Sequence, residues 1–304
     1  MTVYDEFNNL KTFKEQVGSD RAAYTTTFTH DNENRPTLLN FGSSCQVGYI
    51  YDGLGRISRR TVNAGGTAVV TTYGYLAGGY GANSTTPLVQ TITQSGTTLT
   101  YAYDDAGNIT SVSDRTKTIS YEYDLLGRLT RVNDPYDTTS GATGTTWKYS
   151  YDQDGNIQSK TAYAYTTGTV GSVVKTDSFT YGEANWKDKL TAFNDQTITY
   201  DAIGNPTNDG TWNYTWIGGR QMRAMYKGEF GEPGYDEITF EHNENGLRTK
   251  KTRMYYDDAT GDIGYKATNH TLHGSNNLHF FYDAQNKPAV VIFNGTAYAY
   301  LYNR

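Results

Sequence analysis

The side chains of this 304-residue chain that could carry chemistry are mostly aspartates, and many of them recur in one short pattern. The pattern reads aromatic-x-Tyr-Asp-x-x-Gly, then Arg or Asn, then Leu or Ile. Its four most complete copies span residues 49–57, 101–109, 121–129 and 149–157. Because an aspartate that follows a strand can accept backbone N–H bonds in a turn, the repetition indicates that these carboxylates hold turns. That use is structural rather than catalytic.

Metal-ligating patterns are weak. Residues 152–156 are superficially similar to an oxygen-ligand calcium loop, but they lack the distal Glu that such a loop requires and coincide with a copy of the repeat. Residues 256–262 form a second acidic loop that also fits a degenerate turn. His270, His273 and His279 cluster, but a separation of three puts the first two on opposite faces of a strand. We therefore predict no metal and no cofactor.

Candidate catalytic groups outside the repeat are isolated. Cys45 lies in no nucleophile motif, so we expect an idle, buried thiol. The carboxylate pairs that could act as in a glycosidase, Glu237 with Glu241 and Asp201 with Glu183, have no special setting. No Ser/His/Asp arrangement and no phosphate-binding glycine loop stands out. We predict no catalytic residue and no enzymatic activity, and a glycosidase is the weakest of the alternatives.

Composition argues against several classes of protein. The formal net charge is −6, and no Lys or Arg run provides the basic surface of a nucleic-acid binder. The basic residues within 248–253 would divide between two faces of a strand. No apolar stretch reaches the length of a membrane span, and the N-terminus lacks the hydrophobic core of a secretory signal. Hydrophobic residues make up only 36% of the chain, so its 28 tyrosines are expected to pack in thin aromatic layers.

The repeat predicts a β-hairpin. Two aromatic residues separated by one position share a face of a strand, and the aspartate that follows suits the first position of a turn. The glycine three residues later is expected at positive φ. These glycines are Gly55, Gly107, Gly127 and Gly155. Asparagine, which tolerates the left-handed region best after glycine, replaces it at Asn8, Asn34 and Asn286.

The spacing of the copies predicts the architecture. Asp104 and Asp124 lie 20 residues apart, which is about the length of two ordinary strands and two turns. Longer intervals contain expected connections at residues 76–87, 134–146, 166–174 and 225–236. None of these resembles an interdomain linker. We therefore predict an all-β fold, a continuous ribbon of antiparallel hairpins over residues 1–304 with no internal domain boundary.

The residues that define the repeat are expected to be structural. They are Tyr51, Asp52, Gly55, Arg56, Tyr103, Asp104, Gly107, Tyr123, Asp124, Gly127, Arg128, Tyr151, Asp152, Gly155, Tyr200, Asp201, Gly204, Tyr282 and Asp283. We interpret the aromatic stripe as packing. The alternative is a surface that binds glycan or protein, with Trp147, Trp186, Trp212 and Trp216 as further platforms.

The six Tyr-Asp pairs at 51–52, 103–104, 123–124, 151–152, 200–201 and 282–283 closely resemble the YD-repeat family, also called RHS repeats. The resemblance extends over essentially the whole chain, and residues 186–190 and 197–206 are similar to secreted repeat proteins of Gram-positive bacteria. It implies a very large parent protein whose ribbon forms a curved, spiralling open sheet as part of a hollow shell. In bacterial members the shell encloses or delivers a C-terminal toxin, and in animal relatives it belongs to an adhesion receptor.

Departures from the family pattern matter as well. The aspartate is replaced at Ile217, Asn243 and Asn303, and the Asp-Pro-x-Gly type of motif that accompanies self-cleavage is absent. We expect a fragment truncated at both ends, because a repeat array needs capping units. Its expected partners are the rest of a secreted or cell-surface parent shell and the C-terminal effector. Uncapped ends are also expected to associate edge to edge, through residues 4–10 and 297–302.

Overall fold

The computed structural model describes residues 1–16, 23–42, 44–81, 83–230, 232–244, 246–255, 278–285, 287–293 and 296–299. Every regular element in this part of the chain is a β-strand, so the prediction of an all-β fold is confirmed. No helix among the described residues is long and apolar enough to cross a membrane. Backbone contacts divide the chain into two compact units, unit 1 (Met1–Val70 and Tyr200–Arg304) and unit 2 (Thr71–Thr199).

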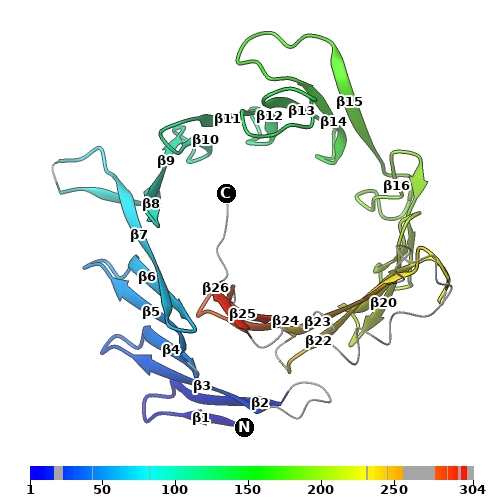
Figure 1. Cartoon of the computed structure of the whole chain (residues 1–304). Helices are drawn as coiled ribbons and strands as arrows, with labels where there is room; N and C mark the ends of the chain where they lie inside the picture. The colour runs from blue at the N-terminus through cyan, green and yellow to red at the C-terminus, as the bar shows by residue number, and fades with distance from the viewer. Residues whose placement is uncertain are drawn as a thin grey trace. The chain divides into compact units, whose positions relative to one another are not determined.

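Unit 1 combines strands from both ends of the chain (Figure 1). Its N-terminal strands are β1 (Thr2–Tyr4), β2 (Leu10–Gln16), β3 (Ala23–His30), β4 (Pro36–Gly42), β5 (Cys45–Tyr51), β6 (Ile57–Ala64) and the start of β7 (Thr67–Ala77). Its C-terminal strands follow from the end of β18 (Thr199–Tyr200) and are β19 (Pro206–Asn208), β20 (Asn213–Ile217), β21 (Gln221–Lys227), β22 (Asp236–His242), β23 (Arg248–Tyr255), β24 (Leu278–Tyr282), β25 (Pro288–Phe293) and β26 (Thr296–Ala299). Successive strands pair antiparallel.

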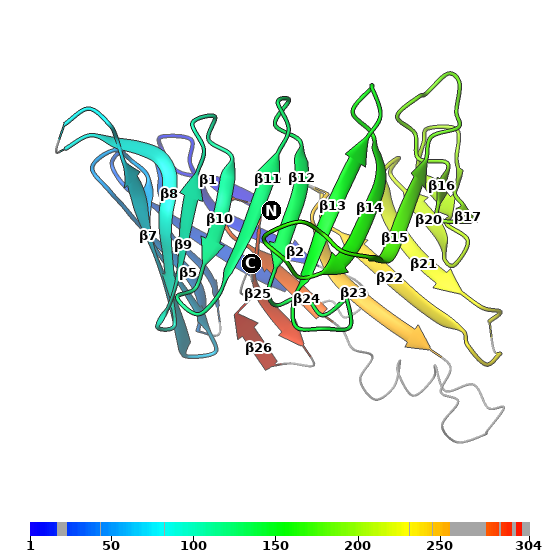
Figure 2. The same cartoon turned by 90° about the horizontal axis from the view of Figure 1, so that it is seen from above.

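Unit 2 is a run of antiparallel hairpins. Beyond β7 it contains β8 (Thr85–Gln94), β9 (Thr97–Tyr103), β10 (Ile109–Ser113), β11 (Thr118–Tyr123), β12 (Leu129–Asp134), β13 (Thr145–Tyr151), β14 (Ile157–Ala164), β15 (Val173–Thr180), β16 (Ala192–Phe193) and β17 (Gln196–Thr197). Figure 2 shows that the turns of hairpins β9–β10, β11–β12 and β13–β14 lie at the same edge. The register shifts beside each of these turns, as a one-residue bulge next to a tight turn requires.

Hydrogen bonding groups β1–β17 into a 17-stranded sheet and β18–β26 into a nine-stranded sheet. Because strands that follow one another in the chain are also neighbours in space, the predicted ribbon of antiparallel hairpins is confirmed. A single repeat array over residues 1–304 stays a prediction.

The four expected connections are present but are shorter than predicted. The structure has them at residues 78–84, 135–144, 165–172 and 228–235. The largest difference is at Pro87, which lies inside β8 rather than in a loop. The pairing of β7 with β8 is irregular between Tyr75 and Ala77. A proline can therefore be accommodated there without loss of a regular ladder hydrogen bond.

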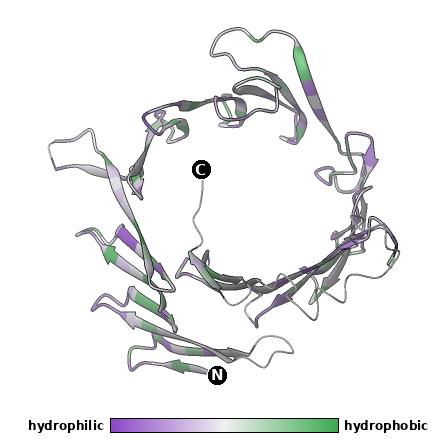
Figure 3. Ribbon diagram, viewed as in Figure 1, coloured by the Kyte–Doolittle hydropathy of each residue, from purple (hydrophilic) through white to green (hydrophobic). Residues whose placement is uncertain are grey.

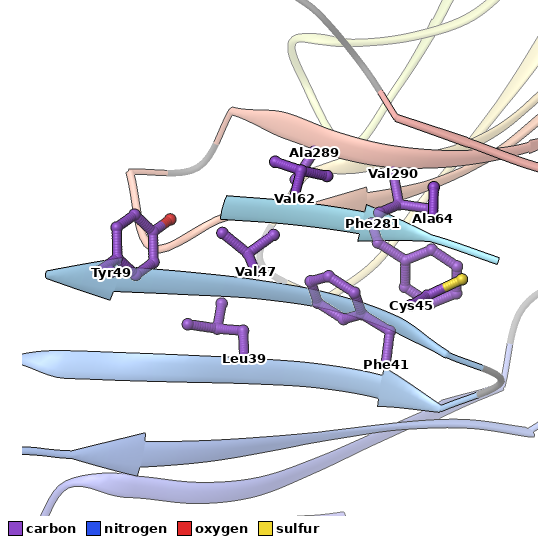
Figure 4. Packing of buried hydrophobic residues seen from close by; sticks show 10 residues of the cluster. All are labelled: Leu39, Phe41, Cys45, Val47, Tyr49, Val62, Ala64, Phe281, Ala289 and Val290. Carbon is purple, nitrogen blue, oxygen red and sulfur yellow. The ribbon is translucent and has the colours of Figure 1, made fainter. Parts of the chain in front are cut away.

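The core of unit 1 forms where the last strands pack on the first ones. Strand β25 contacts β5 and β6, and β26 contacts β6. Buried residues alternate along β5, so one face of that strand is covered. Figure 4 shows the resulting cluster, which consists of Leu39, Phe41, Cys45, Val47, Tyr49, Val62, Ala64, Phe281, Ala289 and Val290. Elsewhere hydrophobic and hydrophilic residues are interspersed along the strands (Figure 3), so most packing layers are thin.

A buried ion pair joins the two parts of unit 1. Arg60 on β6 donates from Nη2 to Oδ2 of Asp283 at 3.0 Å, and the two side chains are only 8% and 3% exposed. Beside them the backbone N–H of Ala284 donates to the hydroxyl oxygen of Tyr49 at 3.3 Å. Burial, with the charge of Asp283 nearby, raises the pKa of Tyr49 to about 12. The phenol therefore stays protonated at neutral pH. The ion pair between Arg60 and Asp283 is thus accompanied by a hydrogen bond between two uncharged groups, the N–H of Ala284 and the hydroxyl of Tyr49.

We predict that Arg60→Leu lowers the free energy of unfolding of unit 1 by about 3–5 kcal/mol. The substitution leaves the carboxylate of Asp283 buried without a counter-charge. Arg59→Leu on the same strand is the matched control, since Arg59 is exposed. Urea unfolding monitored by tyrosine fluorescence measures both variants. Equal stability of the two variants would contradict the prediction.

Candidate functional site: the turn edge of the repeats

The turn that follows β11 shows how the repeat works. The Oδ1 atom of Asp124 accepts hydrogen bonds from the backbone N–H groups of Leu126 and Arg128, both at 2.9 Å. The N–H of Gly127 donates to the carbonyl oxygen of Asp124 at 2.9 Å. One carboxylate oxygen therefore satisfies two backbone donors for which the strand ladder offers no acceptor, and this fixes the turn.

The same arrangement recurs in eight turns of the described chain. In each one, Oδ1 of the aspartate accepts from the N–H groups two and four residues later. The aspartates are Asp5, Asp31, Asp52, Asp104, Asp124, Asp152, Asp201 and Asp283. In the degenerate copy, the side-chain oxygen of Asn243 accepts from the N–H of Leu247 at 2.9 Å.

The backbone of the turns follows the sequence prediction. Gly55, Gly107, Gly127 and Gly155 have φ values of 78°, 87°, 74° and 93°, so the prediction of positive φ is confirmed. Gly204 is also positive, at 86°. The asparagines that replace this glycine behave alike, because Asn8 has φ 64° and Asn34 has φ 62°. Asn286 lies outside the described residues.

The residue four positions after the aspartate has a role that the sequence analysis missed. Arg128 donates from Nε to Oδ2 of Asp124 at 2.7 Å, so the second carboxylate oxygen is also engaged. Seven of the eight turns share this contact, in which Oδ2 accepts from the arginine or asparagine side chain at that position. The regular recurrence of Arg or Asn at this spacing was the signal that could have predicted it.

The tyrosine directly before the aspartate connects several of the hairpins to the preceding one. Tyr123 donates its hydroxyl to the carbonyl oxygen of Ile109 at 2.8 Å, and Tyr151 donates to that of Leu129 at 2.6 Å. In both cases the acceptor is the first residue after the preceding turn. The same relation links Tyr51 to Pro36, Tyr282 to Arg248 and, through the indole N–H, Trp216 to Pro206. Tyr103 donates to Val89 in the less regular hairpin before it, and Tyr200 precedes Asp201 at the end of β18.

Arginines of the turns add a second contact between hairpins. The guanidinium of Arg128 lies 4.6 Å from the ring centre of Tyr151, and that of Arg35 lies 4.5 Å from the ring centre of Tyr51. Each arginine therefore binds the carboxylate of its own turn and stacks on the tyrosine of the next hairpin. Such cation–π contacts stabilise a structure by about 0.5–1 kcal/mol at exposed sites. At these turns neighbouring repeats are therefore held together by side chains of the turn edge.

These contacts limit what the turn carboxylates can do chemically. The pKa of Asp124 is lowered below its ordinary value, mainly by the hydrogen bond from the backbone N–H of Arg128. The pKa of Asp104 is also lowered, mainly by the hydrogen bond from the side-chain amide of Asn108. A carboxylate that is ionised and hydrogen-bonded through both oxygens is a poor general base and a poor metal ligand. The repeat residues are therefore suited to holding structure.

The other groups considered from the sequence do not form a site among the described residues. No group of three or more His, Cys, Asp or Glu side chains there could hold a metal ion. Cys45 is buried in the core of unit 1. Glu237 accepts a hydrogen bond from the hydroxyl of Tyr235, and Glu241 lies four residues along the same strand. The acidic loop at 256–262 and His270 and His273 lie outside the described residues, as does the side chain of His279.

The four tryptophans differ in exposure. Trp147 is buried, donates from Nε1 to Oδ2 of Asp137 at 2.7 Å and has Lys160 over its ring. It anchors the connection before β13 and offers no open platform. Trp212 and Trp216 are half-buried. Trp186 is the most exposed of the four, at 43%.

Comparison with known proteins places the fold but not a family. No protein-family model matches the chain. The chain is 32% identical over 88 residues to the tRNA nuclease WapA of Bacillus subtilis strain 168, a match that covers 27% of this chain and 4% of that protein. The tRNA(Glu)-specific nuclease WapA of Bacillus subtilis subsp. natto gives the same values. The chain therefore spans a small fraction of the length of these relatives.

A solved structure is similar over nearly the whole chain. It is the Photorhabdus luminescens Tc holotoxin pore with a mutated TccC3, which matches with a TM-score of 0.54 and 12% sequence identity. The match covers 97% of this chain and 17% of the other. At this identity the likeness concerns the fold alone. It agrees with the ribbon of antiparallel hairpins described above.

We predict that Gly127→Val lowers the free energy of unfolding by more than about 1 kcal/mol, because a β-branched residue resists positive φ. Space is not the cause, since the nearest atom to an added β-carbon is 3.9 Å away. Gly53→Val is the control, because Gly53 lies in a repeat turn without positive φ and without a neighbour within 4 Å of such a carbon. Chemical denaturation compares the two. A control variant as unstable as Gly127→Val would contradict the conformational argument.

We predict that Tyr123→Phe destabilises the protein by about 1 kcal/mol, the typical net contribution of one hydrogen bond. The change removes only the hydroxyl that bonds to Ile109. Tyr121→Phe is the matched control, because Tyr121 is half-buried on the same strand and its hydroxyl makes none of the bonds between hairpins described above. Differential scanning calorimetry of both variants gives the comparison, and an equal effect would show that the bond between hairpins adds nothing.

The lowered pKa values of the turn aspartates predict acid sensitivity. A carboxyl whose pKa is lower in the folded state stabilises the fold fully above its unfolded pKa, about 3.9, and this stabilisation is lost as pH falls through the folded value. We expect the melting temperature to drop below about pH 4, and to drop less in Asp124→Asn than in the parent chain. Asp105→Asn, at an exposed position beside a turn aspartate, is the control for the loss of one carboxylate outside the turn bonds. Identical profiles for all three proteins would contradict the linkage.

Proposed function

We propose that the chain is a non-catalytic structural segment of a secreted bacterial YD/RHS-repeat toxin, forming part of the shell that encloses or delivers a C-terminal effector. One observation carries this proposal. The groups that recur most often, the Tyr-Asp pairs and the Arg or Asn that follows, are engaged in holding each hairpin and joining it to the preceding one. A chain whose recurrent polar groups are used in this way is suited to forming a wall.

The comparisons with known proteins support a structural role for the chain. The relatives described as tRNA nucleases are far longer than the matched segment, which covers 4% of their length. We infer that any nuclease activity belongs to a different part of such proteins. The fold is also similar to a segment within a toxin assembly. Secretion of the parent protein and a single repeat array over residues 1–304 belong to the same proposal.

The partners in this proposal are the remainder of the shell and the effector. For the isolated chain, we retain the proposal that its ends associate edge to edge through residues 4–10 and 297–302. Strand β1 reaches the first of these segments at Tyr4, and β26 covers residues 297–299 of the second. Residues 300–302 lie outside the described residues. An exposed strand edge offers unpaired N–H and C=O groups to another chain. Sedimentation over a range of concentrations measures such association.

A second candidate function is the binding of glycan or protein by aromatic surfaces. Only one observation favours it, the 43% exposure of Trp186, whose ring lies 5.7 Å from Nζ of Lys189. Trp147 no longer supports it, because that side chain is buried. A glycan array probed with the native chain and with Trp186→Ala distinguishes the two functions, since a shell segment shows no signal that depends on Trp186.

The proposed function predicts protection of the effector. In the purified full-length parent protein, limited proteolysis should spare the C-terminal domain, and Tyr123→Phe with Tyr151→Phe should expose it sooner. The corresponding control is Tyr121→Phe with Tyr149→Phe, which keeps the bonds between hairpins. The chain itself should leave tRNA intact. Rapid digestion of the C-terminal domain in the native parent protein would contradict the shell, and cleavage of tRNA by the chain would contradict the absence of catalysis.

A further inference from the structure

A cavity of about 320 Å³ opens in unit 1 beside the buried cluster. Strands β2 and β3 supply Leu10, Phe13 and Phe28 to its lining, which also includes Leu247 and Phe281. Its size lies at the lower end of the range of small-molecule sites, about 300–1,000 Å³. All of its lining residues belong to unit 1, so the cavity is formed within one compact body.

The two turns beside the cavity both depart from the repeat pattern. In the turn after β22, Asn243 replaces the aspartate, and Leu247 stands four residues later, where the other turns have Arg or Asn. In the turn after β24, that position is Lys287, and Oδ2 of Asp283 binds Arg60 of another strand instead. The first departure puts an apolar side chain into the wall, where the usual pattern would have put a polar one.

Several polar groups of the cavity wall are already engaged in hydrogen bonds within the protein. The side-chain oxygen of Asn243 already accepts from Leu247, and the hydroxyl of Tyr282 already donates to the carbonyl oxygen of Arg248. Asp283 accepts two backbone N–H bonds and the ion pair with Arg60. A buried water is held by about two to four polar contacts. The engaged groups are less available to water, and together with the apolar side chains of the wall this favours an apolar occupant.

The charge of the wall is balanced. No Lys or Arg is among the lining residues, and their one carboxylate, that of Asp283, is paired with Arg60. His30 also lines the cavity. The cavity thus has no fixed charge to select a cation or an anion, and this favours an uncharged ligand.

Part of the wall is held in place by the core. Leu39, Phe41 and Phe281 line the cavity and also belong to the buried cluster. Leu39 is only 1% exposed, and the rings of Phe41 and Phe281 stack with centres 5.0 Å apart. Aromatic walls favour ring-bearing ligands, because rings pair in stacked or edge-to-face geometry. A preformed wall also reduces the entropy that binding costs.

We propose that this cavity is a binding site for an uncharged apolar molecule with one or two aromatic rings. Such a molecule contacts β2–β4 and the turns after β22 and β24. It therefore joins the N-terminal and C-terminal parts of unit 1 and stabilises the folded chain by mass action. The site does not depend on the proposed function, and its test does not involve an effector.

The test uses N-phenyl-1-naphthylamine, an uncharged fluorescent probe, titrated into the full chain. The expected result is saturable binding of one probe per chain and a raised melting temperature. Leu247→Asn restores the residue type usual at that turn position and puts an amide in the wall, so affinity should fall at least tenfold. Leu10→Trp fills the cavity and should abolish binding. Leu99→Trp, at a half-buried leucine of β9 in unit 2, is the matched control and should bind as the native chain does.

Absence of saturable binding by the native chain would overturn the proposal. Binding that survives both Leu247→Asn and Leu10→Trp would overturn it as well, because the probe would then lie elsewhere. Circular dichroism and thermal melting establish that each variant is folded. If Leu10→Trp does not melt cooperatively, Thr26→Phe, which fills the cavity from β3, takes its place and is read in the same way.

Discussion

The hydrogen bonds of the turn aspartate are the interaction on which the ribbon depends. A hairpin with a thin apolar face has little core to set its register, and a slip of one residue would turn every side chain to the other face. The carboxylate removes this freedom, because in the turn after β11 it accepts from the N–H groups two and four residues later. The register shift beside that turn lies next to Tyr123, whose hydroxyl donates to Ile109 of the preceding hairpin.

The local part of this design is visible in the sequence because all of its parts lie within six residues. Asp followed by Gly predicts both the turn and the positive φ of Gly127, which the structure shows at 74°. The destination of the Tyr123 hydroxyl could not be predicted in the same way. The carbonyl oxygen of Ile109 becomes the acceptor only through the stagger between two hairpins. That stagger is set by the connection between them, whose length varies from repeat to repeat.

The long-range ion pair between Arg60 and Asp283 could be predicted from the sequence only in part. Lys287 at the fourth position after Asp283 interrupts the rule of Arg or Asn, and so leaves one carboxylate oxygen without its usual partner. That oxygen is bound by Arg60, more than 200 residues away in the chain. The sequence indicates that a partner is missing from the turn, but it does not indicate which arginine replaces it. Only the packing of β25 and β26 on the strands near Arg60 decides this.

The regular repeats and the degenerate ones therefore have different capacities. In a regular turn such as that of Asp124, both carboxylate oxygens are occupied within the turn, so the carboxylate is not available to a partner elsewhere in the chain. A turn that departs from the pattern gives up some local stability and gains a side chain that can act elsewhere. In the turn of Asp283 the carboxylate binds Arg60, and in the turn of Asn243 the side chain of Leu247 lines a cavity. In a ribbon built from one repeated turn, specific chemistry is thus expected first at the copies that break the pattern.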